Sequence, residues 1–209
     1  KKKNNDLVYI SSGPENFENS MKVYKDIKIE TNKYFYPEKI LMKTIEKFCD
    51  FNNLNLKILG RARDDDSEKC ELDFYQNLLK KRLDKNYYSF KNKYQSSYEV
   101  CDQSKICVCI YSALGLEILS RYCKTVIFNF RSEATQLENL NIFSPMRVRN
   151  NGEFWSSEMD QNKILEKLTY VNNLREDQWR NTLNNFKLIN LLGRDEGNKN
   201  FIKLLNEKN

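Results

Sequence analysis

Residues 106–117 of the chain, ICVCIYSALGLE, decide its fold. The first six of these residues are continuously apolar, which is typical of a strand buried on both faces of a parallel sheet. The run passes through Ser112 into a helical pattern that extends from about Leu114 to Tyr122. A strand that continues directly into a helix is half of a βαβ unit, so this stretch predicts an α/β fold.

The rest of the chain repeats this alternation of short apolar runs and longer amphipathic stretches. The other predicted strands cover residues 6–10, 54–59, 87–90 and 124–130. Strands that alternate with helices are joined by right-handed crossovers, and the sheet that they form is largely parallel. The sequence therefore predicts a Rossmann-like, doubly wound, mostly parallel sheet followed by C-terminal helices.

Three residues are expected to mark the beginnings of helices. Pro37 is expected to open the helix that carries the apolar stripe of residues 40–49, because a first helical residue does not use its N–H. Ser67 is expected to cap the next helix, and Ser96 or Ser97 a shorter one after it.

The length of 209 residues and the apolar content of 40% suit one globular domain. We expect a single nucleotide-sugar-binding lobe over residues 1–209, with its core at about 6–131, a loop at 132–160 and a helical C-terminal part at 160–208. The net charge of +6 comes from 35 basic and 29 acidic residues that are intermixed along the chain. Such a surface favours anionic ligands weakly and does not predict nucleic-acid binding.

Several classes of chemistry are excluded or disfavoured by composition. The chain has no histidine, which excludes a Ser–His–Asp or Cys–His arrangement within it. Its six cysteines form no CxxC pair, so we expect free thiols, no metal site and no cofactor. No segment reaches the roughly 20 apolar residues of a membrane span. We expect a cytoplasmic protein with at most peripheral contact at the inner face of the membrane.

The candidate binding residues follow from the position of the predicted turns. Ligands of parallel sheets bind at the edge where the carboxyl ends of the strands meet. Four turns are predicted to converge there, at residues 11–13, residues 60–63, Ser89 and residues 112–115.

The turn at Ser112 offers the most to a ligand. Its backbone N–H groups and helix dipole attract an anion, and Gly115 lets a phosphate approach closely. Glu117, one turn further along, can accept hydrogen bonds from ribose or sugar hydroxyls. The alternative is that Ser112 only caps the helix and that Gly115 only packs against the sheet.

Arg61 and Arg63 stand two residues apart on an extended segment directly after a predicted strand. Two guanidinium groups in this position can bind a phosphate or a carboxylate. The alternative is that both pair with the acidic residues 64–66 on a solvated loop. The sequence leaves this choice open.

The segment from Ser96 to Arg131, SSYEVCDQSKICVCIYSALGLEILSRYCKTVIFNFR, resembles the C-terminal lobe of a group of bacterial surface-carbohydrate biosynthesis proteins. A pattern of the form StLGyEala.GkKv.ffn.R recurs in that group. Residues 152–155 and 195–199 resemble it further along the chain. These proteins are similar to two-lobed GT-B glycosyltransferases, and more distantly to the transferases of Kdo and sialic acid, which use CMP-linked donors.

The resemblance implies that this lobe binds a nucleotide-sugar donor, with the turn after Tyr111 at the donor phosphate. It places Arg61 and Arg63 at a turn that in related enzymes is often Lys-x-His-Pro or arginine-rich, and here that turn offers no histidine as an acid. The residues expected to bind the nucleotide sugar are Ser12, Gly13, Arg61, Arg63, Ser89, Tyr111, Ser112, Ala113, Leu114, Gly115 and Glu117.

The functional expectation is a donor-binding domain of a glycosyltransferase in bacterial surface polysaccharide synthesis. Its partners would be a nucleotide-sugar donor and a glycan or glycolipid acceptor. Because the acceptor and the catalytic base of a GT-B enzyme come from an N-terminal lobe, and the chain begins at Lys1, we expect a piece of a longer protein that does not transfer sugar alone. The alternatives are a GT-B-like nucleotide-sugar epimerase and a non-catalytic, flavodoxin-like interaction domain.

Overall fold

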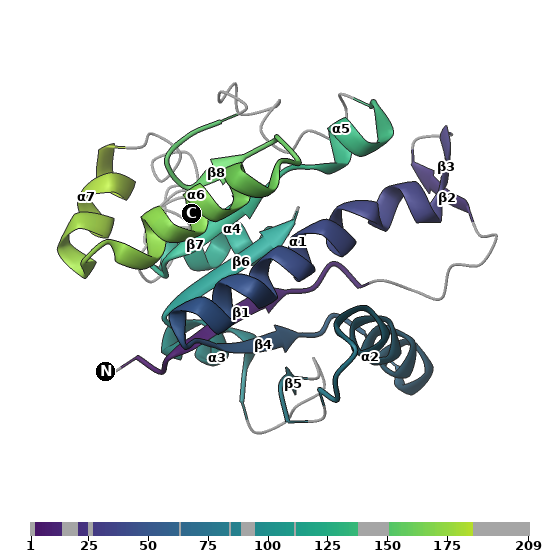
Figure 1. Cartoon of the computed structure of the whole chain (residues 1–209), viewed down its shortest axis with the longest axis horizontal. Helices are drawn as coiled ribbons and strands as arrows, with labels where there is room; N and C mark the ends of the chain where they lie inside the picture. Colours follow the sequence, from purple (N-terminus) through teal and green to yellow (C-terminus); the bar gives the residue numbers. More distant parts are fainter. Residues whose placement is uncertain are drawn as a thin grey trace, which may run out of the picture.

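A computed structural model gives the structure of the greater part of the chain. The residues described are 3–13, 21–24, 27–62, 64–83, 85–88, 95–110, 112–137 and 151–185. They form one six-stranded parallel sheet with helices against both of its faces (Figure 1). A separate antiparallel hairpin, β2 (Met21–Tyr24) and β3 (Ile27–Glu30), precedes the first helix.

The order of the strands in the sheet locates the edge that matters for function. The strands are β1 (Asp6–Ile10), β4 (Asn55–Leu59), β5 (Tyr87–Tyr88), β6 (Ile106–Ile110), β7 (Thr125–Phe128) and β8 (Trp155–Ser156). Their order across the sheet is β5-β4-β1-β6-β7-β8, and every pair is parallel. The chain therefore adds β4 and β5 on one side of β1, and then adds β6, β7 and β8 on the other side. This is the strand order of the Rossmann fold, as the sequence predicts.

The helices form two layers. They are α1 (Thr31–Asn52), α2 (Asp65–Leu79), α3 (Ser97–Gln103), α4 (Ala113–Ser120), α5 (Arg131–Thr135), α6 (Gln161–Asn173) and α7 (Glu176–Asn185). In Figure 1, α1 and α6 lie in front of the sheet and α3 and α4 lie behind it. Both layers cover β6, and all five of its residues are fully buried. This explains why its sequence is continuously apolar.

Two helices begin at residues other than the predicted ones. The helix α1 begins at Thr31, and Pro37 lies inside it. Pro37 cannot bond the carbonyl of Lys33, but Lys33 is exposed, and the buried Thr31 and Phe35 favour the additional turns. The cap of α2 is Asp64, whose carboxylate accepts the N–H of Ser67 at 2.8 Å.

The structure describes residues 132–137 and 151–160 of the region predicted as a loop. These residues include most of α5 and the strand β8, and both Trp155 of β8 and the preceding Phe154 are buried. The carbonyl of Phe154 accepts the N–H of Ile127 at 3.0 Å and joins β8 to the sheet. The sequence did not indicate β8, because a strand of two residues carries no periodicity.

The helix α7 is anchored to the sheet by one aromatic side chain. Trp179 is fully buried, and its Nε1 donates to the carbonyl of Tyr122 at 3.0 Å, just before β7. Its ring packs edge-to-face on Phe154, with the centroids 5.3 Å apart. The helix predicted at 198–207 lies outside the described residues.

Candidate functional site

The reversal of strand order between β1 and β6 defines the candidate site. Where order reverses, the segments that follow the two strands turn toward opposite faces and leave a crevice at the carboxyl ends. The strands end level with one another, because Ile10 is in register with Leu59 of β4 and with Cys109 of β6. The turns after β1, β4 and β6 therefore leave the sheet side by side.

The turn after β1 is held in one conformation by its first serine. Ser11 is buried, and its Oγ lies 2.8 Å from the hydroxyl of Tyr75 and accepts the N–H of Gly13 at 3.0 Å. Gly13 has a φ of +72°, which favours glycine strongly over residues with a Cβ. The backbone direction at the crevice is thus fixed by sequence and by hydrogen bonding together.

The turn after β4 is organised by a buried carboxylate. Glu71 of α2 is almost fully buried, and its Oε2 accepts the N–H groups of Arg61 and Ala62, both at 3.0 Å. The same oxygen accepts the hydroxyl of Tyr87 at 2.9 Å. These amides are therefore engaged within the protein, and this turn presents to a ligand the side chain of Arg61.

The side chain of Arg61 reaches across to the turn after β1. Its Nη1 donates to the carbonyl of Ser12 at 3.5 Å, a long contact, and its Cδ lies 3.5 Å from the place of a Cβ on Gly13. Arg61 is exposed, so its guanidinium can turn to an anion at the edge. The structure brings together three of the residues expected to bind the nucleotide sugar, namely Ser12, Gly13 and Arg61.

A buried ion pair that the sequence did not single out lies beside Ser12. Glu38 of α1 is fully buried, and Arg131, which follows β7, is 2% exposed. Nη2 of Arg131 donates to Oε1 of Glu38 at 2.9 Å, and Nη1 donates to the hydroxyl of Tyr34 at 2.9 Å. The hydroxyl of Ser12 donates to the same Glu38 oxygen. The pair joins α1, the turn after β1 and the end of β7.

The ion pair is incompletely satisfied. Within the described part of the chain, no hydrogen-bond partner reaches Oε2 of Glu38 or Nε of Arg131. Burial is the largest influence on the pKa of the Glu38 carboxyl and raises it, although Arg131 and Ser12 act to lower it. Burial acts to lower the pKa of Arg131, but Glu38 and Tyr34 outweigh it and the pKa is raised.

The turn after β6 forms the N-terminal cap of α4. Ser112 is the N-cap of α4, and its Oγ accepts the N–H of Gly115 at 3.4 Å. A Cβ on Gly115 would lie 2.3 Å from Sγ of Cys109, so glycine is needed for α4 to pack on β6. The structural roles considered for both residues are therefore present. Of the first-turn amides, those of Ala113 and Leu114 have no acceptor inside a helix of this geometry.

The remaining predicted residues are distributed as follows. Glu117 is exposed and accepts the hydroxyl of Tyr98 of α3 at 2.5 Å, so its carboxylate faces the neighbouring helix. Arg63, Ser89 and Tyr111 lie outside the described residues.

Of the two residues of the buried ion pair, one carries a signal in the sequence and the other does not. Arg131 directly follows an apolar strand, which is the same signal that selected Arg61. Glu38 carries no such signal, because a carboxylate beside Lys39 in an amphipathic helix looks solvated until the helix is placed on the sheet.

The described residues hold neither a cluster of metal ligands nor a membrane-spanning helix. No group of three or more carboxylates and thiols there is arranged to hold a metal ion. None of the helices described is long and apolar enough to cross a membrane.

The comparisons with known proteins agree with the general character of the resemblance noted in the sequence. No match was found among the curated proteins or among the solved structures. One family model matches residues 1–209, and its description is "putative O-antigen biosynthesis protein". The match covers the whole sequence given. The chain therefore belongs to this family of O-antigen biosynthesis proteins, and its role is in surface-carbohydrate biosynthesis.

Proposed function

We propose that the chain binds the nucleotide-sugar donor of a glycosyltransferase, as the C-terminal lobe of a GT-B enzyme that uses a CMP-linked, Kdo-like sugar. The observation that carries the proposal is the reversal of strand order between β1 and β6. This reversal places Arg61, Gly13 and the first turn of α4 at one edge, which is where dinucleotides and nucleotides bind in sheets of this order. Membership in an O-antigen biosynthesis family supports a sugar nucleotide over other nucleotides.

The chemistry available at this edge suits a phosphate. Arg61 supplies an exposed guanidinium, and Ala113 and Leu114 supply backbone N–H groups at the positive end of the α4 dipole. During transfer the bond from the anomeric carbon to the phosphate oxygen breaks, and a bond to an acceptor hydroxyl oxygen forms. The departing nucleotide keeps the bonding electrons, and these donors stabilise its additional negative charge. The base that takes the hydroxyl proton would come from a second lobe.

Ser12 gives the edge a polar group of defined direction. Its hydroxyl donates to the Glu38 carboxylate, so the lone pairs of Ser12 Oγ remain available as acceptors. A hydroxyl of the ribose or of the transferred sugar can donate to this oxygen. In this arrangement Glu38 and Arg131 are positioning residues that act through Ser12.

The test is a thermal-shift panel with CMP, UDP, GDP and ADP at millimolar concentration. A nucleotide that binds the folded state at 100 times its Kd stabilises it by about 2.7 kcal/mol, which raises the melting temperature by several degrees. We expect CMP to produce the largest shift and Arg61→Ala to abolish it. Arg175→Ala is the matched control, because Arg175 is an exposed arginine paired with Asp177 on α7.

The outcomes discriminate between the proposed functions. A shift with another nucleotide would keep donor binding and reject the CMP-linked sugar. The absence of any shift would reject donor binding and favour an interaction domain without a nucleotide. A shift that Arg61→Ala leaves unchanged would move the phosphate away from the β1–β4 side of the edge.

A further inference from the structure

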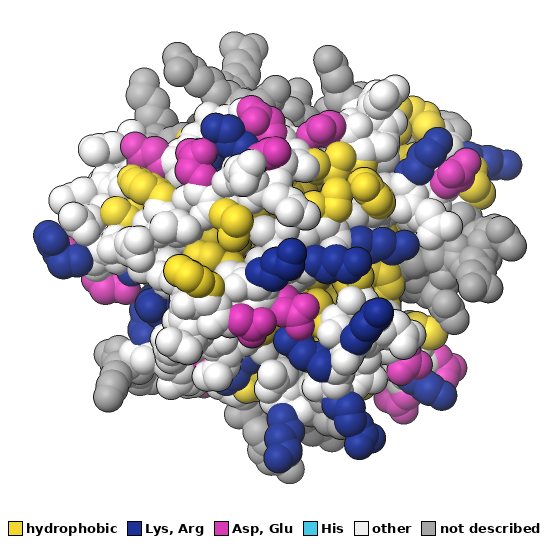
Figure 2. Space-filling view, viewed as in Figure 1, with side chains coloured by type: hydrophobic (Ala, Val, Ile, Leu, Met, Phe, Trp, Pro, Cys, Tyr) yellow, Lys and Arg dark blue, Asp and Glu magenta, His cyan; other side chains and the backbone are white. Residues whose placement is uncertain are grey.

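The outward face of α1 carries a row of lysines. Lys39, Lys43 and Lys47 are all exposed and follow one another at intervals of four residues, which places them on one line about 6 Å apart along the helix. The opposite face of α1, with Leu41 and Ile45, is buried against the sheet. Lysine and arginine side chains stand in a row across the middle of the molecule in the view of Figure 2.

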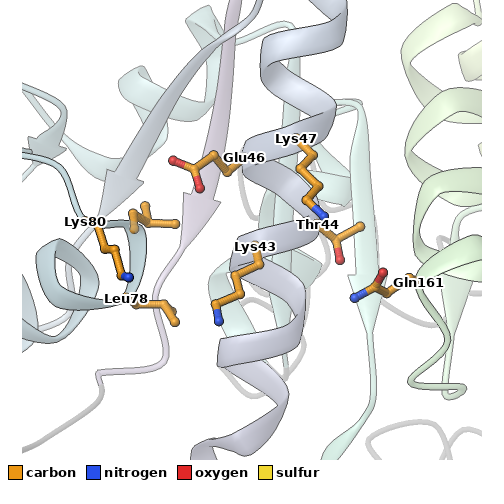
Figure 3. A pocket seen from close by; sticks show the side chains of 8 residues that line it. Lys43, Thr44, Glu46, Lys47, Leu78, Lys80 and Gln161 are labelled. Carbon is orange, nitrogen blue, oxygen red and sulfur yellow. The ribbon is translucent and has the colours of Figure 1, made fainter.

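The row continues onto the end of α2. Lys80 follows α2 and lines, together with Lys43 and Lys47, a shallow hollow of about 300 Å³ beside α1 (Figure 3). Lys81 comes next in the chain, and its ammonium pairs with Glu46 at 2.7 Å. The carboxylates on this stretch of α1 are Glu46 and Asp50, so the cations predominate.

Two exposed aromatic side chains stand at the ends of the same line. Tyr36 lies one turn before Lys39 and is 50% exposed, and Phe51 lies one turn after Lys47 and is 88% exposed. Clusters of lysines on a helix are typical of surfaces that bind anionic headgroups, and aromatic side chains are enriched where membranes meet water. The lysines reach the charged headgroups, and the aromatic rings sit at their level.

The arrangement favours an extended anionic surface over a single small anion. Lys39, Lys43 and Lys47 are spread along a convex helix, and Lys39 does not line the hollow that Lys43, Lys47 and Lys80 share, whereas a bound phosphate requires donors that converge on one point. A leaflet that contains anionic lipids offers negative charges over a plane, and each lysine near it contributes independently. We propose that this lysine row, with Tyr36 and Phe51, docks the protein on an anionic lipid surface.

The docking face and the candidate site share one helix. Glu38 belongs to the site on the inner side of α1, and Lys39 belongs to the row on its outer side. A protein that lies on a membrane along α1 therefore holds its candidate site beside the lipid surface. The docking itself does not depend on the proposed donor binding.

The test is cosedimentation of the full chain with vesicles of phosphatidylcholine alone or mixed with phosphatidylglycerol. We expect binding at low salt to the mixed vesicles, weaker binding as salt rises, and little binding to phosphatidylcholine alone. The triple variant Lys39→Gln, Lys43→Gln, Lys47→Gln should lower the partition coefficient on the order of 100-fold. Phe51→Ser should lower it about tenfold in a manner that salt changes little.

A second triple variant controls for net charge. Lys28→Gln, Lys69→Gln, Lys163→Gln removes three exposed lysines from β3, α2 and α6 and should leave vesicle binding unchanged. Both triple variants should melt close to the parent temperature, because surface substitutions change stability by about 0.5 kcal/mol or less. Equal losses in the two triple variants would overturn the proposal, as would absence of binding to the mixed vesicles or tighter binding to a DNA or RNA oligonucleotide. Arg61→Ala should bind vesicles normally, which separates this result from the nucleotide test.

Discussion

Two buried glutamates stand at the same edge of the sheet and are satisfied to different extents. The carboxylate of Glu71 accepts two backbone N–H groups and the hydroxyl of Tyr87. The carboxylate of Glu38 uses one oxygen for Arg131 and Ser12, and in the described structure its other oxygen has no partner. A satisfied buried carboxylate fixes the protein around it, whereas an unsatisfied one retains hydrogen-bonding capacity.

The comparison separates scaffold from site. Glu71 binds the backbone of its turn, so the position of Arg61 is set before any ligand arrives. Glu38 binds the side chains of Arg131 and Ser12 and no backbone group of a turn. Burial of its unpartnered oxygen costs about 1–3 kcal/mol, and a donor that reached this oxygen would recover that free energy. The two glutamates should therefore respond differently to substitution and to ligand.

The largest effect is expected from Arg131→Met. This change leaves the Glu38 carboxylate buried without its cation, and breaking a buried ion pair in this way costs about 3–5 kcal/mol. The free energy of unfolding in urea measures it. The double variant Glu38→Leu, Arg131→Met should recover much of the loss, since no charge is then left buried. A double variant as unstable as the single one would show that packing of the arginine, and not charge, holds this region.

Glu71→Gln should reduce the free energy of unfolding by about 2–3 kcal/mol. The amide that replaces the carboxylate has one accepting oxygen of lower charge, and its NH₂ group faces backbone donors, so charge-assisted hydrogen bonds are lost. The change should also move the Arg61 turn and weaken nucleotide binding. Glu68→Gln, on the same helix, is the control. If Glu71→Gln is as stable as the parent, then Glu71 is not the organiser of this turn.

The turn after β6 differs from both glutamate-bound turns, because close packing and a helix cap define it. Gly115→Ala places a methyl group against Sγ of Cys109 and should cost about 1–2 kcal/mol. Cys109→Ala makes room for the methyl group, so the double variant should be more stable than Gly115→Ala alone. Nucleotide binding by that double variant decides whether Gly115 also serves a phosphate: restored stability with lost binding supports this role, and restored binding contradicts it.

The pH dependence of stability should distinguish Glu38 from Asp102. Its pKa is raised in the folded state, so its contribution to stability is present below the unfolded pKa of about 4.3 and is lost as pH rises through the folded pKa. The stability of the parent relative to Glu38→Gln should therefore fall as pH rises from 4, by at most about 1.4 kcal/mol per unit. Asp102→Asn should show the opposite trend at lower pH: pairing with Arg121 lowers the pKa of Asp102, so the stability of the parent relative to this variant should fall as pH drops below about 4. Parallel trends would contradict the assignment.

More of the fold than of the candidate site could be predicted from the sequence, and the reasons are physical. The continuous apolar run in β6 reflects burial on both faces, a property that a single strand carries by itself. The two residues of β8 carry no such pattern. The site depends on contacts between distant segments, such as Glu38 with Arg131, 93 residues apart. Arg61 and Arg131 could be selected because they follow strands, but the partner of Arg131 depends on how α1 packs.

The smallest loss of stability is expected when a helix cap is removed. Ser112→Ala removes the cap of α4, whose hydrogen bond to Gly115 is long at 3.4 Å, and should cost about 0.5–1 kcal/mol. Asp160→Ala removes the cap of α6, whose bond to Lys163 is 3.0 Å, and should cost somewhat more. Bound nucleotide should change the difference in stability between the two variants only if the N-terminus of α4 belongs to the site. Ser112→Ala should weaken the nucleotide shift, while Asp160→Ala should not. Equal shifts in both variants would mean that Ser112 is a cap and nothing more, and would leave Arg61 as the principal anion contact of the edge.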